Sequence, residues 1–285
     1  ITSKVFIFCI AAGIFALLAV PNMYVAYKYT AGLRPGSNMP SGLYQTAMRL
    51  LGWGAVGCLI LGAILLGTTL SSQWEAVLRF LHQVPFQETD PVFEKDFSFY
   101  LFSLPLLEYV RSWLLTAVVV TIILTGGFYY ISSKLRGEVF SLSGRITSHL
   151  AVLAAMALVL LAVGHWLSRY ELLYSSMGTV YGVGYTESTV LLPGYAVLTF
   201  VALAAAGLLI AGALSGRKRL IIWPVVAWVG LNILVTILVP GLVQRLMVEP
   251  SELAREKEYL QSNIQHTRNA FGLEDLVSKS HPARS

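Results

Sequence analysis

The sequence predicts an all-α fold: a polytopic transmembrane helix bundle of about six spans, with interfacial helices in its outer loops. Composition is the first observation, since 56% of the residues are hydrophobic and only 12% are charged, more apolar surface than a water-soluble domain could bury. The second is a set of six apolar runs, each close to the roughly 20 residues that a helix needs to cross a bilayer. The third is the uneven distribution of Lys and Arg between the connections.

The six predicted spans lie near residues 5–27, 50–71, 112–132, 149–167, 194–214 and 221–241. Between their ends none carries Asp, Glu, Lys or Arg, whereas ion-coupled transporters usually hold ionisable groups at mid-membrane. Asn232 is a strongly polar side chain at depth, for which an interhelical hydrogen bond is favoured over a substrate contact. Pro21, Pro224 and Pro240 fall near span ends, where we expect helices to terminate.

Helix packing is predicted in the second span, where the small residues Gly54, Cys58 and Gly62 recur at four-residue spacing. Small residues let two backbones approach closely in lipid. Packing within the molecule is the favoured interpretation, and a seam between identical chains is the alternative. Cys9 and Cys58 both fall inside apolar runs and so indicate no disulfide framework.

Orientation follows from Lys and Arg, which resist translocation across the membrane. Nine of them fall in loops 28–49, 133–148 and 215–220, which are therefore predicted to be cytoplasmic. Segments 72–111, 168–193 and everything after about 242 are predicted to be extracytoplasmic. The first residues would then also be extracytoplasmic, so an intact protein that starts in the cytoplasm would need an odd number of earlier spans.

The first outer loop combines an amphipathic helix with a run of carboxylates. Residues 72–84 place apolar side chains at helical spacing, with Trp74 as an interfacial anchor. Glu88, Asp90, Glu94 and Asp96 then crowd around Lys95. Carboxylates can hold a hard cation, and the candidate ligands are Asp90, Glu94 and Asp96, but their spacing fits no EF-hand. A solvated or salt-bridged loop is the favoured interpretation.

The second outer loop is rich in tyrosine and contains Gly178, Gly182 and Gly184, which predict a folded loop with unusual backbone angles. His165, at its start, is either an interfacial side chain or a ligand or proton carrier. After the last span, Pro250 and Ser251 open a helix that Gly272 closes at the C′ position. Its apolar stripe, formed by Leu253, Leu260, Ile264 and Phe271, must be buried against another surface.

Four blocks of residues resemble a known family. The first is Asp90, Pro91, Val92, Phe93, Lys95, Asp96, Ser98, Phe99, Tyr100, Phe102, Leu104 and Pro105. The second is Arg169, Tyr170, Glu171, Leu172, Leu173, Tyr174 and Ser175. The third is Gln244, Arg245, Val248, Glu249, Pro250 and Glu252, and the fourth is Glu256, Tyr259, Asn263, Ile264, Thr267, Arg268, Ala270, Phe271, Gly272 and Leu273.

In this order the blocks resemble UPF0182, a family of large multi-spanning bacterial membrane proteins. The likeness runs from about residue 50 to 275. The resemblance implies about seven spans in the bacterial cytoplasmic membrane, followed by a large extracytoplasmic domain. This chain looks like that membrane domain without its first span and its outer domain. The expected domains are a transmembrane domain at 1–245, an amphipathic helix at 246–275 leading to the soluble domain, and a disordered tail at 276–285.

Three functions are weighed, and the resemblance carries over no catalytic residue. A noncatalytic membrane anchor or docking component of the cell envelope is favoured. One alternative is a channel, lipid-handling or transport component. The other is an envelope enzyme that uses Glu88, Asp90, Asp96 or His165. The expected partners are the lipid bilayer and other envelope proteins; a net charge of +5 without a basic stripe argues against nucleic acid. The sequence identifies no cofactor and no oligomeric state.

Overall fold

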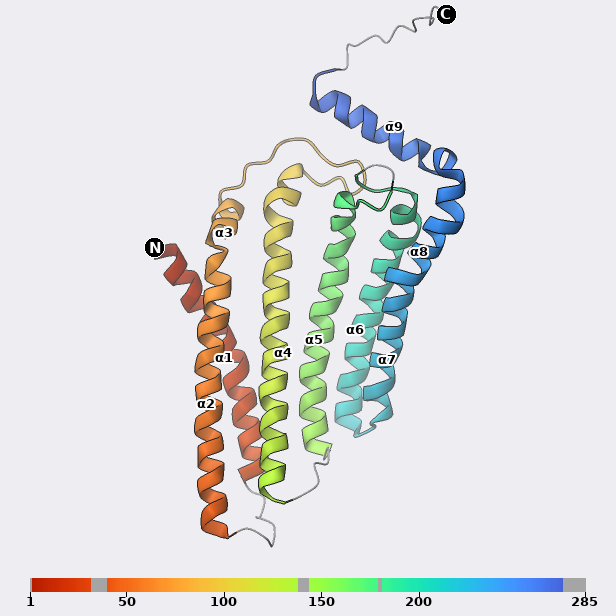
Figure 1. The fold of residues 1–285 in the computed structure, drawn as a ribbon. Helices are drawn as coiled ribbons and strands as arrows, with labels where there is room; N and C mark the ends of the chain where they lie inside the picture. Colours follow the sequence, from red (N-terminus) through yellow and green to blue (C-terminus); the bar gives the residue numbers. More distant parts are fainter. Residues whose placement is uncertain (1, 32–39, 138–143, 179–180, 274–285) are drawn as a thin grey trace, which may run out of the picture. The chain divides into compact units, whose positions relative to one another are not determined.

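The computed structural model describes residues 2–31, 40–137, 144–178 and 181–273. Its helices are α1 (Thr2–Ala31), α2 (Ser41–Ser72), α3 (Trp74–Leu81), α4 (Leu104–Leu135), α5 (Gly144–Glu171), α6 (Leu192–Ser215), α7 (Arg219–Ile233), α8 (Val239–Val243) and α9 (Glu252–Ala270) (Figure 1). Short π or 3₁₀ segments are η1 (Phe99–Ser103), η2 (Leu172–Tyr174), η3 (Glu187–Leu191), η4 (Leu234–Leu238), η5 (Gln244–Val248) and η6 (Glu249–Ser251). The described residues contain no β-strand, so the predicted all-α fold is confirmed.

Within the described residues, six helical segments are long and apolar enough to cross a membrane: Thr2–Thr30, Gly42–Ser72, Phe99–Leu135, Gly144–Tyr174, Glu187–Ser215 and Arg219–Ala270. Each predicted span lies within one of them. The helices are longer than the apolar runs, so α4 also carries Glu108 and Arg111, which the sequence had placed outside the span. The expected amphipathic helix after the second span is α3, one residue after the end of α2.

The prediction that helices end at the prolines is wrong. Pro21 lies inside α1, and Pro224 lies inside α7. Pro240 lies in the first turn of α8, directly after the π-helical segment η4. A proline removes one backbone donor, and local π geometry is one way in which a membrane helix absorbs that loss without ending.

Packing groups the chain into two compact units. Unit 1 comprises Ile1–Tyr170 and Val197–Gly230, and unit 2 comprises Glu171–Ala196 and Leu231–Ser285. Segments far apart in sequence thus share a unit, and the expected division at residue 245 stays a prediction. The expected tail at 276–285 lies outside the described residues.

The core of unit 1 forms where α1, α2 and α4 lie side by side (Figure 1). Phe15 is fully buried there and packs with Leu66 and Trp113. The indole N–H of Trp113 donates to the carbonyl of Leu66 at 2.9 Å, which satisfies its polar atom inside the core. A second cluster surrounds Tyr129, and a third joins α5, α6 and α7.

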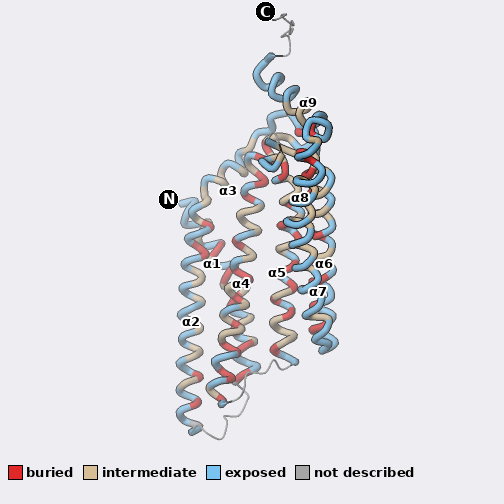
Figure 2. The backbone as a smooth tube through the Cα atoms, turned by 45° about the vertical axis from the view of Figure 1, so that its right-hand side comes forward, coloured by how far each residue is buried: buried red, intermediate tan, exposed pale blue. Residues whose placement is uncertain are grey.

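The outward faces of these helices are apolar as well. Leu17 of α1 is 79% exposed and Trp53 of α2 is 75% exposed. In Figure 2 much of α2 is exposed or intermediate rather than buried. Large apolar side chains spread over such long faces would be unfavourable in water, but acyl chains solvate them. The surface of unit 1 therefore agrees with the apolar sequence of its helices.

The small residues of α2 differ in their surroundings. A Cβ on Gly62 would lie 2.8 Å from a ring carbon of Phe15, so this glycine makes room for α1. A Cβ on Gly54 would meet no atom within 4 Å, and Cys58 is exposed. Of the predicted packing residues on α2, Gly62 is the one that touches a buried side chain of a neighbouring helix.

Two helix ends match their sequence signals. Pro105 lies in the first turn of α4, where its missing N–H costs no helical bond. Gly272, with φ of +63°, follows α9 in the left-handed conformation, and the N–H of Leu273 donates back to the carbonyl of Arg268 at 2.8 Å. The predicted glycine C-cap is confirmed.

Candidate functional site

The acidic loop, residues 82–98 between α3 and η1, is organised by Asp90, which is buried. Its Oδ1 accepts the N–H groups of Val92 and Phe93 at 2.8 and 2.7 Å. Its Oδ2 accepts the N–H of Lys95 at 2.9 Å and the hydroxyl of Tyr100 at 2.7 Å. Four protein donors thus satisfy one carboxylate, which replaces the water it loses on burial.

Asp96 ties the two ends of the same loop together. Its Oδ1 accepts the N–H groups of Phe86 and Ser98 at 3.1 and 2.8 Å, and its Oδ2 accepts that of Gln87 at 2.9 Å. Hydrogen bonds from the side chain and backbone of Ser98, with smaller contributions from Phe86 and Gln87, lower the pKa of Asp96 from 3.8 to about 2. Asp96 therefore stays a carboxylate throughout the physiological pH range.

The remaining charged residues of the loop point to solvent. Glu88, Glu94 and Lys95 are exposed, as is Pro91. Glu94 has φ of +54°, a turn conformation that non-glycine residues adopt uncommonly. Among the described residues, no three Asp, Glu, His or Cys side chains converge in a way that could hold a metal ion, and this includes Asp90, Glu94 and Asp96.

An aromatic cluster brings two of the motif blocks together within unit 1. The ring of Tyr170, at the end of α5, lies 4.8 Å from Phe93, 5.1 Å from Phe99 and 6.5 Å from Tyr100, measured between centroids. Their mutual tilts are favourable for aromatic pairs. The acidic loop is therefore fixed by its carboxylates from within and by Tyr170 from α5.

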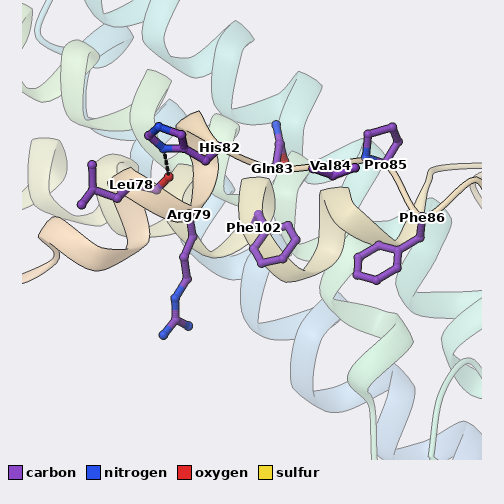
Figure 3. Close-up of a pocket in the computed structure, with 8 residues that line it drawn as sticks. All are labelled: Leu78, Arg79, His82, Gln83, Val84, Pro85, Phe86 and Phe102. Atoms are coloured by element: carbon purple, nitrogen blue, oxygen red, sulfur yellow. Dashed lines mark hydrogen bonds between the residues drawn. The ribbon is translucent and has the colours of Figure 1, made fainter.

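A groove of about 570 Å³ lies beside α3 (Figure 3). The rings of Phe86 and Phe102 are stacked, with centroids 6.3 Å apart. Arg79 is exposed and lies 3.6 Å from Glu75 in an i,i+4 ion pair. The lining residues are Leu78, Arg79, His82, Gln83, Val84, Pro85, Phe86 and Phe102. An apolar groove with a cation at its edge suits an amphiphile.

In unit 2, two glutamates lie deep in the protein: Glu256, which belongs to the fourth motif block, and Glu187, which the sequence analysis did not single out. Glu187 of η3 is 0% exposed, and Glu256 of α9 is 1% exposed. Oxygens from both lie 3.0 Å from the position that a Cβ on Gly184 would take. The sequence signal for Glu187 is faint: a single acidic residue at the start of a long apolar run.

In unit 2, several motif residues join separate segments of the chain through side-chain hydrogen bonds. The hydroxyl of Thr186 donates to Gln244 Oε1 at 2.7 Å, and the side-chain amide of Asn263 donates to the carbonyl of Tyr181 at 3.0 Å. The guanidinium of Arg268 donates to the Leu273 carbonyl. Several motif residues of this unit are exposed, namely Glu171, Arg245, Glu249, Pro250 and Thr267, whereas Leu172, Val248 and Glu256 are buried.

A polar network that the sequence did not predict crosses unit 1. His149 Nε2 lies 2.9 Å from Asn22 Oδ1, and its Nδ1 lies 2.8 Å from the Tyr129 hydroxyl. The amide nitrogen of Asn22 donates to Leu18, so its Oδ1 is an acceptor. The consistent arrangement has His149 donating from Nε2 and accepting from Tyr129 at Nδ1. This network links α1, α4 and α5.

Other polar residues also lie within the long helices. The guanidinium of Arg111 packs against Gly164, where a Cβ would lie 3.0 Å from Cζ. The neighbouring His165 lies with its ring 5.9 Å from that of Trp228. Arg169 stacks over Trp166 at 4.3 Å. In unit 2, Asn232 is half-buried, and its carbonyl accepts the hydroxyl of Thr236.

A family model described as "Uncharacterised protein family (UPF0182)" matches residues 1–285. Similar proteins, each described as a UPF0182 protein, come from Trichodesmium erythraeum at 39% identity, Moorella thermoacetica at 36% and Arthrobacter sp. at 34%. These alignments cover 76%, 78% and 94% of this chain but 24%, 25% and 28% of the relatives. The chain thus spans about a quarter of the length of the curated relatives it matches. No solved structure matches it.

Proposed function

The chain belongs to the uncharacterised protein family UPF0182, and from this premise we propose that it is a noncatalytic membrane anchor with one docking platform in each unit. The platform of unit 1 is the acidic loop with Tyr170, and the platform of unit 2 is α9. Their occupant is polypeptide of the kind that the relatives carry beyond the matched quarter of their length.

The main support for this proposal is the hydrogen bonding of the carboxylates of Asp90 and Asp96. Every oxygen of Asp90 and Asp96 accepts at least one hydrogen bond from within the loop or from Tyr100. A catalytic acid or base needs an oxygen that can reach a substrate proton. These two carboxylates instead fix the loop backbone, which supports a structural role over the envelope-enzyme alternative.

Exposed apolar side chains on and next to α9 also support the docking role. Leu253 is 81% exposed and Phe271 is 74% exposed, on a helix that is otherwise charged. Isolated apolar side chains on a surface need no explanation, but a stripe at helical spacing is typical of a helix that docks against another surface. Attached polypeptide reaches such a stripe at high effective concentration.

Site-directed cross-linking tests the platform of unit 2. A photoreactive amino acid is placed at Leu253 or Phe271 of the full-length protein in native membranes, with Lys257, a charged and exposed position of α9, as the matched control. The expected result is a protein cross-link from the apolar positions that peptide mapping assigns to the same polypeptide or to one constant partner. Cross-links to lipid alone from Leu253 and Phe271 would contradict the docking role.

Lipid handling is the second candidate, because two open apolar grooves each contain one arginine. The groove beside α3 contains Arg79, and a groove of about 380 Å³ formed by α1, α2 and Phe128 contains Arg49. Anionic headgroups pair well with arginine while acyl chains fill apolar surface. Native mass spectrometry of the full-length protein tests this function: bound phospholipid that is lost in Arg49→Gln or Arg79→Gln would favour it.

A further inference from the structure

In unit 2, Glu187 and Glu256 come together from the two separate chain segments that make up the unit, and this pairing is independent of the proposed docking role. Each has an oxygen, Oε2, that lies 3.0 Å from the Cβ position of Gly184, so these oxygens are separated by no more than twice that distance. Two carboxylates this close repel each other unless something positive lies between or beside them.

Protein groups satisfy only part of this pair. The Ser175 hydroxyl donates to Glu187 Oε1, and the N–H of Gly184 donates to Glu187 Oε2 at 3.1 Å. The N–H of Tyr185 donates to Glu256 Oε1 at 3.2 Å. Glu256 Oε2 is buried and has no hydrogen-bond partner among the described residues. It is an unsatisfied acceptor that borders the same space beside Gly184 as Glu187 Oε2.

Among the described residues, no positive side chain forms an ion pair with either glutamate, since no Lys, Arg or His nitrogen of that part of the chain lies within 4.0 Å of their oxygens. All donors to the pair are neutral. Buried carboxylates without a counter-charge are strongly unfavourable, so proteins pair them or use them to coordinate metal ions.

Gly184 keeps the space beside Glu256 free of a side chain. A Cβ on Gly184 would lie 3.0 and 3.2 Å from the Glu256 oxygens, a tight approach, whereas a Cβ on Gly178 would lie 3.8 Å from both, an ordinary contact distance. Neither glycine has a left-handed φ, whereas Gly182 has φ of +119°. The predicted unusual angle therefore applies to Gly182, and the close approach of backbone and carboxylate applies to Gly184.

From this geometry we infer that Glu187 and Glu256 form a binding site for a hard divalent cation, calcium by its ligand chemistry. Calcium accepts carboxylate, backbone carbonyl and water oxygens in flexible geometry, and two carboxylates match its charge. Bound calcium would tie α9 to η3 and to the loop that carries Gly184. The site lies outside the acidic loop, in which the spacing of carboxylates had suggested metal.

The first measurement uses the full-length protein in detergent after removal of divalent ions with a chelator. Calcium is titrated by calorimetry, and terbium serves as a luminescent calcium substitute that nearby tyrosines such as Tyr185 can sensitise. We expect saturable binding with a Kd of about 10⁻⁴–10⁻³ M, the range of extracellular calcium modules. Calcium should displace terbium and raise the melting temperature.

Variants assign the binding to this pair. Glu187→Gln and Glu256→Gln keep shape but remove charge, and each should weaken calcium binding by about tenfold or more, since ligand charge tunes calcium affinity. Gly184→Ala keeps both carboxylates but puts a methyl group between them, and it should weaken binding as well. Glu258→Gln, at an exposed position two residues from Glu256, is the matched control and should bind as the wild type does.

Three results would overturn the inference. One is the absence of saturable calcium or terbium binding in the wild type at millimolar ion. Another is binding that survives in both Glu187→Gln and Glu256→Gln. The third is a wild type that binds no calcium together with a Glu256→Gln variant that melts at a higher temperature, which would show that the pair is neutralised by a shared proton. None of these results bears on cross-linking from α9.

Discussion

At the scale of single residues, the carboxylates of the acidic loop act as acceptors for backbone amides. Asp90→Asn would replace one carboxylate oxygen by an amide nitrogen. That nitrogen would face either the N–H groups of Val92 and Phe93 or the N–H of Lys95 and the hydroxyl of Tyr100. At least one buried N–H would then lose its acceptor, at a cost of about 1–3 kcal/mol. We expect a lower melting temperature in detergent for Asp90→Asn. Glu88→Gln, at an exposed position of the same loop, is the control and should melt as the wild type does.

Asp96 gives the loop a defined response to acid. Its pKa is lowered to about 2 in the fold from 3.8, so its stabilisation is complete above the unfolded value and is lost as the pH falls from about 4 to about 2. The difference in melting temperature between wild type and Asp96→Asn should therefore shrink over that interval. A difference that stays constant from pH 5 to pH 2, roughly, would show that Asp96 titrates normally.

The spacing of the carboxylates in the acidic loop did not show which of them are buried. The spacing of Asp90, Glu94 and Asp96 predicted a solvated or salt-bridged loop, with metal binding as the alternative. The spacing of charged residues shows only which charges are close along the chain. The carboxylates of Asp90 and Asp96 accept hydrogen bonds from backbone N–H groups, and the directions of those groups depend on how the loop turns. That Asp90 is buried while Glu94 is exposed could only come from the folded loop.

At the scale of helices, Gly62 and Gly54 form a matched pair on α2. Gly62→Ala would put a Cβ 2.8 Å from Phe15, and overpacking a tight contact costs about 1–3 kcal/mol. Gly54→Ala meets no atom within 4 Å and gains helix propensity, so it should be neutral or stabilising. Thermal unfolding of both variants in the same detergent checks the contrast, and equal effects would contradict it.

The contribution of the His149 network to stability can be measured by removing one of its hydrogen bonds. Tyr129→Phe removes the hydroxyl that lies 2.8 Å from His149 Nδ1 and leaves the ring in place. Side-chain hydrogen bonds between membrane helices contribute about 0.6 kcal/mol on average and up to about 1.7. We expect a loss in that range, measured by unfolding in mixed micelles. Tyr24→Phe, at an exposed position of α1, should have no effect.

Sequence periodicity could not have found this network. Asn22, Tyr129 and His149 belong to three different helices, and each alone is an ordinary polar residue near a span end. Their meeting depends on the rotation of α1, α4 and α5 about their own axes. Apolar spans constrain that rotation weakly, because lipid-facing and core-facing positions are both hydrophobic.

At the scale of the whole molecule, the distribution of Lys and Arg makes a testable prediction about sidedness. In a variant whose native Cys9 and Cys58 are replaced by Ser, a cysteine at Lys218 should react with an impermeant maleimide only after cells are permeabilised. A cysteine at Glu258 on α9 should react in intact cells. Labelling of position 218 in intact cells would overturn the orientation predicted by the positive-inside rule.

The sequence by itself determined the helical class, the six apolar spans, the family blocks and the glycine cap of α9, because length, hydropathy and capping chemistry are local properties. Only the tertiary structure decided that Asp90 and Asp96 hold backbone amides, that Gly62 rather than Gly54 receives Phe15, and that Glu187 meets Glu256. These facts depend on which faces of distant segments come together. In membrane spans that are apolar on every side, hydrophobic patterning carries little of that information.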